Sequence, residues 1–163
     1  MMLAGSGIRD QITKFAASGG VERSWGLSMP EKKTIERARQ DAREGKAPTT
    51  QAGEFVREEI EHVREGKHGV RSTKQAIAIG LSQARRAGVK LPPPKEGQTS
   101  EPTRKKAERD YRKGQAKSAT KPSAKRSRAR IDALKREGRS AVSRKALSKQ
   151  AKQAARKRQS RKG

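Results

Sequence analysis

Apolar residues recur at helical spacing only in the middle of the chain. Between about residues 50 and 66 they recur every three or four positions, as on one face of a helix: Ala52, Phe55, Val56, Ile60 and Val63. A similar face, with Ile77, Leu81 and Ala84, predicts a helix over 72–87. A weaker stripe predicts a preceding helix over 30–44. The pattern therefore predicts a small unit of two or three helices.

Local signals set the ends of these helices. Ser72 and Gln75 have the spacing of a capping box, and Gly45, Gly66 and Gly88 follow the predicted helices as stops. Gly80 lies within the apolar face of the last helix. There it costs about 1 kcal/mol of helix propensity relative to Ala, which a close approach by a neighbouring helix would offset.

We therefore expect the helices over 50–66 and 72–87 to pack as an antiparallel hairpin. Val89 and Leu91 would fold back over it as a small lid before three consecutive prolines, 92–94, mark a domain boundary. Helical turns are also expected over about 102–113, 124–137 and 141–158, with Ser123 and Ser140 as caps and Gly114 and Gly138 as stops. Their apolar residues are few, so like charges would keep these helices apart.

The predicted fold class is thus mainly α, with four regions. Residues 1–28 are Gly- and Ser-rich and patternless, and we interpret them as a disordered extension, with Met29 as an alternative natural start. The small helical domain covers 29–91, and a Pro-rich linker covers 92–101. A long, largely disordered basic tail with transient helices covers 102–163.

Charge separates these regions more sharply than hydrophobicity does. The chain has 42 Lys and Arg against 17 Asp and Glu, a net charge of +25, and residues 92–163 carry 25 of those basic residues against 6 acidic ones. A polyanion is the natural partner of such a segment. Aromatic residues make up only 2% of the chain, which argues against single-strand binding by base stacking. We therefore expect sequence-independent contacts to phosphate.

The residues expected to make these contacts are the Lys and Arg side chains of the basic tail: Arg104, Lys105, Lys106, Arg109, Arg112, Lys113, Lys121, Lys125, Arg126, Arg128, Arg130, Lys135, Arg136, Arg139, Arg144, Lys145, Lys149, Lys152, Arg156, Lys157, Arg158, Arg161 and Lys162. Secondary phosphate contacts are expected from basic residues in and around the last helix of the domain: Arg71, Lys74, Arg85, Arg86 and Lys90.

Other chemistry finds little support in the sequence. There is no cysteine, and no phosphate loop or nucleophile motif appears. His62 with Glu58 and Glu65 would be a metal set on one helix face, but solvated polar residues are the favoured interpretation. We expect no catalysis, no metal and no cofactor.

Two local alternatives concern the predicted helices. Residues 76–82 resemble the turn of a helix-turn-helix, yet Gly88 and Pro92 leave too little room for a recognition helix, so one continuous helix is favoured. The acidic helix over 50–66 would contact the first helix, the tail or a protein partner, or simply face solvent.

The stretch from Met29 to Pro94, and above all residues 50–88, resembles a bacterial family of small basic proteins of uncharacterised function. The tail looks like the Lys- and Ala-rich tails of linker-histone-like bacterial proteins. The first resemblance implies a bacterial cytoplasmic protein, and the charge of the tail predicts that it is associated with the nucleoid. We expect a non-enzymatic, histone-like DNA-binding protein, with an RNA-binding or ribosome-associated protein as the alternative. The hairpin would serve self-association or a protein partner, and neither a membrane nor a small-molecule substrate is expected.

Overall fold

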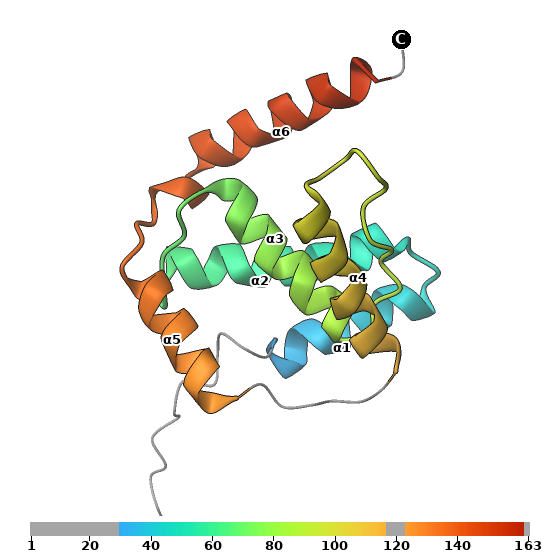
Figure 1. Ribbon diagram of the computed structural model, residues 1–163, viewed down its shortest axis with the longest axis horizontal. Coiled ribbons are helices and arrows are strands. Elements are labelled where there is room, and N and C mark those ends of the chain that lie inside the picture. The colour runs from blue at the N-terminus through green and yellow to red at the C-terminus, as the bar shows by residue number, and fades with distance from the viewer. Residues whose placement is uncertain (1–29, 117–122, 162–163) are drawn as a thin grey trace, which may run out of the picture.

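The computed structural model describes residues 30–116 and 123–161, and this part of the chain is mainly helical, as predicted. The extension over 1–28, Lys121 and Lys162 lie outside the described residues. The described elements are six α-helices and one short 3-10 helix (Figure 1): α1 (Lys32–Arg43), α2 (Pro48–Arg64), α3 (Thr73–Arg86), α4 (Glu101–Gln115), α5 (Ala124–Lys135), η1 (Ser140–Val142) and α6 (Arg144–Gln159).

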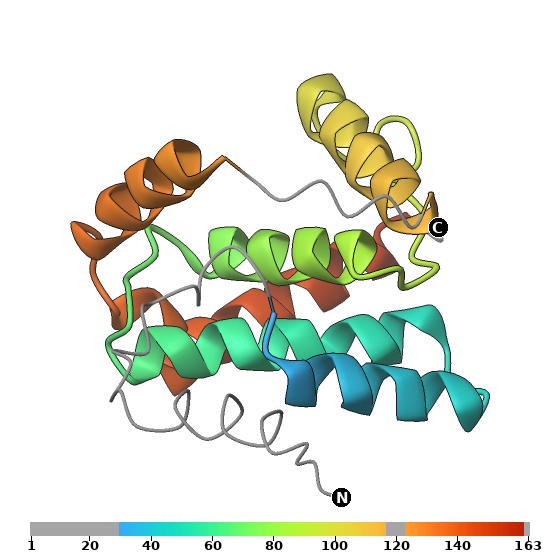
Figure 2. The same ribbon diagram turned by 90° about the horizontal axis from the view of Figure 1, so that it is seen from below.

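Helices α1, α2 and α3 form a unit in which each runs antiparallel to the next (Figure 2). The predicted close approach is present at Gly80, where an added Cβ would lie 2.7 Å from the Val56 Cα atom. Ser72 caps α3 by accepting a 3.2 Å hydrogen bond from the Gln75 N–H. The Gln75 side chain accepts from the N–H of Arg71 rather than of Ser72, so the capping box closes one residue earlier than expected. Helix α3 is continuous through residues 76–82. This confirms the prediction of one continuous helix there instead of the turn of a helix-turn-helix.

One core cluster lies where α1, α2 and the end of α3 meet. Its centre is Phe55, which is fully buried. Val89 and Leu91 belong to this cluster, so the predicted apolar lid is present. The Arg85 guanidinium holds the lid by donating to the carbonyl oxygens of Leu91 and Pro92.

Part of the segment expected to be a disordered tail packs against this unit instead. Val142 is 1% exposed and packs with Val63, Val70 and Ala76. In α5, the buried side chains of Ile131 and Leu134 pack against Ile79, a side chain that the predicted apolar face of α3 does not include. The expectation that thin apolar content would keep these segments apart is wrong for α5 and η1, because one or two apolar residues in each are enough to pack against side chains of α2 and α3.

Backbone hydrogen bonds fix the same junction. The Gly69 N–H donates to the Leu134 carbonyl oxygen at 3.0 Å, and the Val70 N–H donates to the Gly138 carbonyl oxygen at 2.9 Å. The loop between α2 and α3 is therefore paired with the turn that follows α5. We name residues 134–142 the docking segment.

Two residues predicted to mark the ends of helices do not do so in α4 and α6. Gly114 does not stop α4, which continues to Gln115; a Cβ there would collide with the Arg85 carbonyl oxygen, so this glycine permits close packing on α3. Ser140 lies in η1, and the cap of α6 is Ser143, whose hydroxyl accepts from the Ala146 N–H. Ser123 occupies the N-cap position of α5 but accepts no hydrogen bond there.

Candidate functional site

Helix α6 presents a row of basic side chains to solvent. It contains seven Lys and Arg residues and no Asp or Glu, and all seven are exposed. Four of them lie at positions i, i+4, i+7 and i+11, which align on one face of an α-helix: Lys145, Lys149, Lys152 and Arg156. We name these four residues the α6 stripe. No ion pair involves α6 within the described part of the chain.

The remaining positions of α6 explain its orientation. Leu147, Gln150 and Ala154 are only partly exposed and lie on the side of the helix opposite the α6 stripe, with the partly exposed Ala146 between the two sides. Figure 1 shows α6 running along one edge of the molecule. The helix has no buried residue of its own, and it contacts α3 and the preceding η1.

Helix α5 adds a second exposed basic group. Lys125, Arg126, Arg128 and Arg130 are all exposed, with no ion pair among the described residues, while Ile131 and Leu134 face the protein. The expected contacts at Lys135, Arg136, Arg139 and Arg161 are exposed as well.

The basic residues of α4 are less available. Arg104 is half-buried and pairs with Glu101 at 2.8 Å, and Arg112 lies 3.8 Å from Glu108. Acidic residues of the same helix therefore offset part of its charge. The other expected contacts of this helix are exposed: Lys105, Lys106, Arg109 and Lys113.

The expected secondary contacts divide into two groups. Lys74 and Lys90 are exposed, and Arg71 is exposed but pairs with Glu137 at 3.1 Å. Arg85 is only 7% exposed, and its guanidinium donates to the two lid carbonyl oxygens. It is therefore not available to phosphate, contrary to the expectation from sequence. Arg86 is half-buried and donates to the Ser82 carbonyl oxygen; burial lowers the pKa of both guanidinium groups.

The interior holds a group of polar side chains that the sequence interpretation assigned to solvent. Glu58, Glu59, His62 and His68 are all at most 5% exposed, and Glu31 lies at their edge. We name these five residues the buried polar cluster. Glu65, which the sequence suggested as a partner of His62, is exposed and pairs with Lys67 instead.

The contacts within the buried polar cluster form two sets. In the first set, the His62 Nε2 atom lies 3.1 Å from Glu31 Oε1 and 3.8 Å from Glu58 Oε1, and Glu58 Oε1 also accepts a hydrogen bond from the Glu31 N–H. In the second set, His68 Nε2 lies 3.5 Å from Glu59 Oε1. Burial and the neighbouring Glu58 carboxylate raise the pKa of Glu59 to about 7, and burial lowers the pKa of His68. The signal that could have found this arrangement is the Glu-x-x-His spacing of Glu59 and His62.

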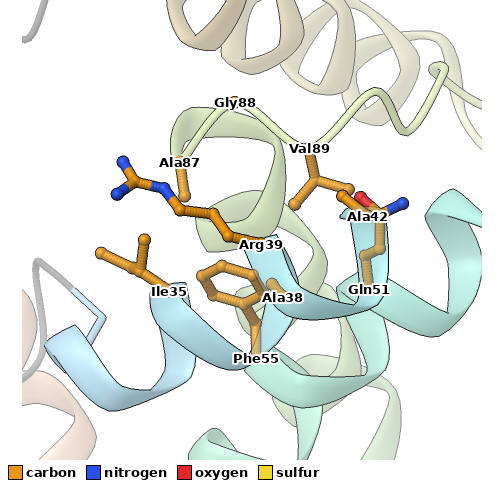
Figure 3. Close-up of a pocket in the computed structure, with 9 residues that line it drawn as sticks. All are labelled: Ile35, Ala38, Arg39, Ala42, Gln51, Phe55, Ala87, Gly88 and Val89. Atoms are coloured by element: carbon orange, nitrogen blue, oxygen red, sulfur yellow. The ribbon is translucent and has the colours of Figure 1, made fainter. Parts of the chain in front are cut away.

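A separate apolar hollow of about 160 Å³ lies between α1, α2 and the end of α3 (Figure 3). Phe55 forms its floor, and Ile35 and Val89 line its sides. Ligand pockets typically measure 300–1,000 Å³, so this hollow is small for a cofactor.

Comparison with known proteins gives a family match for the helical unit of α1, α2 and α3. Residues 29–96 match the model of a family of unknown function (DUF6496), which covers α1, α2 and α3. This agrees with the resemblance of that segment to an uncharacterised family. No curated protein and no solved structure matches the chain. Within the described ranges, no helix is both long and apolar enough to cross a membrane.

Proposed function

We propose that this protein binds nucleic acid, and DNA in the first place, by neutralising phosphate without reading sequence. The observation that carries the proposal is the α6 stripe: four aligned, exposed cations on a helix without any acidic residue. We further propose that the protein is histone-like and associates with the nucleoid in the bacterial cytoplasm. RNA is the alternative ligand, because its phosphates offer the same charge.

The dimensions of the α6 stripe suit a polyphosphate. Eleven residues at 1.5 Å rise per residue separate its ends by about 16 Å. Duplex DNA carries one phosphate charge per about 1.7 Å of axis, so a helix of this length lies beside many phosphates at once. Flexible Lys and Arg side chains on an exposed helix fit phosphate better than they fit base edges, which need a rigid bidentate geometry.

Binding of this kind follows counterion release. If the whole chain neutralises about 8 to 12 phosphates, the logarithm of the affinity falls with the logarithm of salt at a slope of about −7 to −11. The α5 group of Lys125, Arg126, Arg128 and Arg130 then supplies about 3 to 4 units of that slope, and the α6 stripe a similar share. Unrelated duplexes should give nearly the same slope.

The test replaces all four residues of the α6 stripe by Gln in the full chain. We expect weaker binding to every duplex and a salt slope flatter by about 3 to 4 units, measured by fluorescence anisotropy. The matched control removes four exposed basic residues from α1, namely Lys32, Lys33, Arg39 and Arg43. This control has the same net charge but an intact α6, and it should bind almost as tightly as the unmodified protein.

Three outcomes would contradict the proposal. Equal losses in the two quadruple variants would mean that net charge, not α6, decides binding. A preference of about 1,000-fold for one duplex would indicate a specific regulator. A competition in which structured RNA displaces duplex DNA at equal salt would favour the RNA-binding alternative.

A further inference from the structure

The buried polar cluster contains more acceptor atoms than its hydrogen bonds can satisfy. Glu58 Oε2, Glu59 Oε1 and His68 Nε2 are buried and have no hydrogen-bond partner among the described residues. A buried polar atom without a hydrogen-bond partner destabilises the fold, and it does so more strongly when it is charged. We propose that Glu59, His62 and His68 bind a divalent metal ion of the zinc class.

The tautomer of His68 leaves a lone pair on its Nε2 atom. Its Nδ1 atom lies 3.1 Å from the Gly69 carbonyl oxygen, which only accepts, so Nδ1 holds the proton and donates. In a neutral imidazole Nε2 then keeps a lone pair, and that lone pair faces Glu59 Oε1 at 3.5 Å. Two acceptor atoms face each other in the interior, where Glu59 is 1% exposed and His68 is 2% exposed. A cation is needed between them.

Geometry favours a metal ion over a single shared proton. The ligand atoms of Glu59, His62 and His68 all lie within 4.8 Å of one another, so one ion can reach all three. Tetrahedral zinc, with bonds of about 2.0–2.1 Å, places its ligand atoms about 3.3–3.4 Å apart, which small side-chain rotations would achieve. A proton satisfies one pair only, whereas a doubly charged ion also offsets the nearby carboxylates of Glu58 and Glu31.

The surroundings of the ligands match those of metal-binding histidines. Such a histidine usually donates its other ring N–H to a carbonyl or carboxylate, as His68 does to Gly69. Glu59 and His62 are three residues apart on α2 and share a face. Two imidazoles and a carboxylate suit Zn²⁺ and its neighbours in the transition series, whereas Mg²⁺ and Ca²⁺ prefer oxygen ligands.

The location indicates a structural role for the metal. His68 lies in the loop whose Gly69 and Val70 hydrogen-bond to the docking segment. An ion held by α2 and this loop would fix the loop, and with it the attachment of α5 and η1. Metal binding should therefore be separable from phosphate binding by the α6 stripe.

The decisive experiment titrates Zn²⁺ into the chelator-treated full chain by isothermal calorimetry. We expect one ion per chain, with a dissociation constant on the order of 1 µM or tighter. Thermal unfolding should shift upward with zinc concentration. Co²⁺ should give the strong visible absorption of a tetrahedral site. The variant that lacks the α6 stripe should bind zinc as the unmodified protein does.

Substitutions assign the ligands. Glu59→Gln and His68→Gln should each weaken zinc binding by at least about tenfold. The matched control is Glu61→Gln, an exposed carboxylate on the same helix, which should leave it unchanged. Absence of zinc binding by the unmodified chain would overturn the proposal and leave a proton shared between Glu59 and His68. An equal loss in Glu61→Gln would also overturn it. The titration of the unmodified chain decides even if a variant fails to fold.

Discussion

Replacement of Gly80 by Ala tests the packing on which the rest of the fold depends. In an isolated helix this change would be favourable by about 1 kcal/mol. Here the new Cβ would lie 2.7 Å from Val56 Cα, 2.8 Å from Val56 N and 3.0 Å from Phe55 C, all of them backbone atoms. Because a backbone cannot rotate away, α2 and α3 must separate by close to an ångström, which loosens the packing around Phe55.

Overpacking of this kind typically costs 1–3 kcal/mol beyond any local gain. We therefore expect Gly80→Ala to lower the free energy of unfolding by about 2 kcal/mol, and the thermal midpoint by about 4–8 °C in a chain of this size. Urea and thermal unfolding followed by circular dichroism measure both quantities.

The matched control is Gly53→Ala in α2. An added Cβ at Gly53 meets nothing within 4 Å, so the same substitution should raise stability by about 0.4–1 kcal/mol. If Gly80→Ala proves as stabilising as Gly53→Ala, then α2 and α3 do not approach closely at Gly80, and the hairpin packing is wrong.

Three further predictions concern the later helices: two test how they attach, and one tests whether they bind DNA. Val142→Asp buries a carboxylate against Val63 and should detach α6, so amide exchange should rise in 134–159 while α1 to α3 stay protected; unchanged protection would contradict the docking. Ser82→Ala removes the 2.6 Å hydrogen bond to Asp110 and should destabilise α4 by about 1–3 kcal/mol, seen as faster exchange in α4 alone. A chain ending at Leu91 should remain helical but lose most DNA affinity, and a truncated chain that binds as tightly as the full one would contradict the assignment of binding to the later helices.

The hairpin could be predicted because its signals are local. The apolar spacing of α2 and the cap at Ser72 act within one or two turns, and Gly80 marks within its own helix the point where α2 approaches. The docking of α5 and η1 could not be predicted in the same way. Val142 is one apolar residue in a basic segment, and its role depends on an open site formed by Val63 and Ala76 about 70 residues earlier.

The buried polar cluster escaped prediction for a related reason. In sequence, Glu58, Glu59 and His62 stand in a run of charged residues and are typical of a solvated helix face. In the folded chain, however, Glu31 from before α1 contacts Glu58 and His62, and His68 from before α3 lies beside Glu59. Helical periodicity describes one element at a time, and it carries no information about what other elements cover.

The hydrogen bond between Gly69 and Leu134 has a consequence for how this chain can vary. It closes a loop of 65 residues, and the entropy of closing a flexible loop grows only with the logarithm of its length. Ten further residues anywhere between Gly69 and Leu134 would therefore weaken the closure by only about 0.1 kcal/mol. The place at which α5 and η1 attach is thus set by the docking segment and depends only weakly on how many residues separate Gly69 from Leu134.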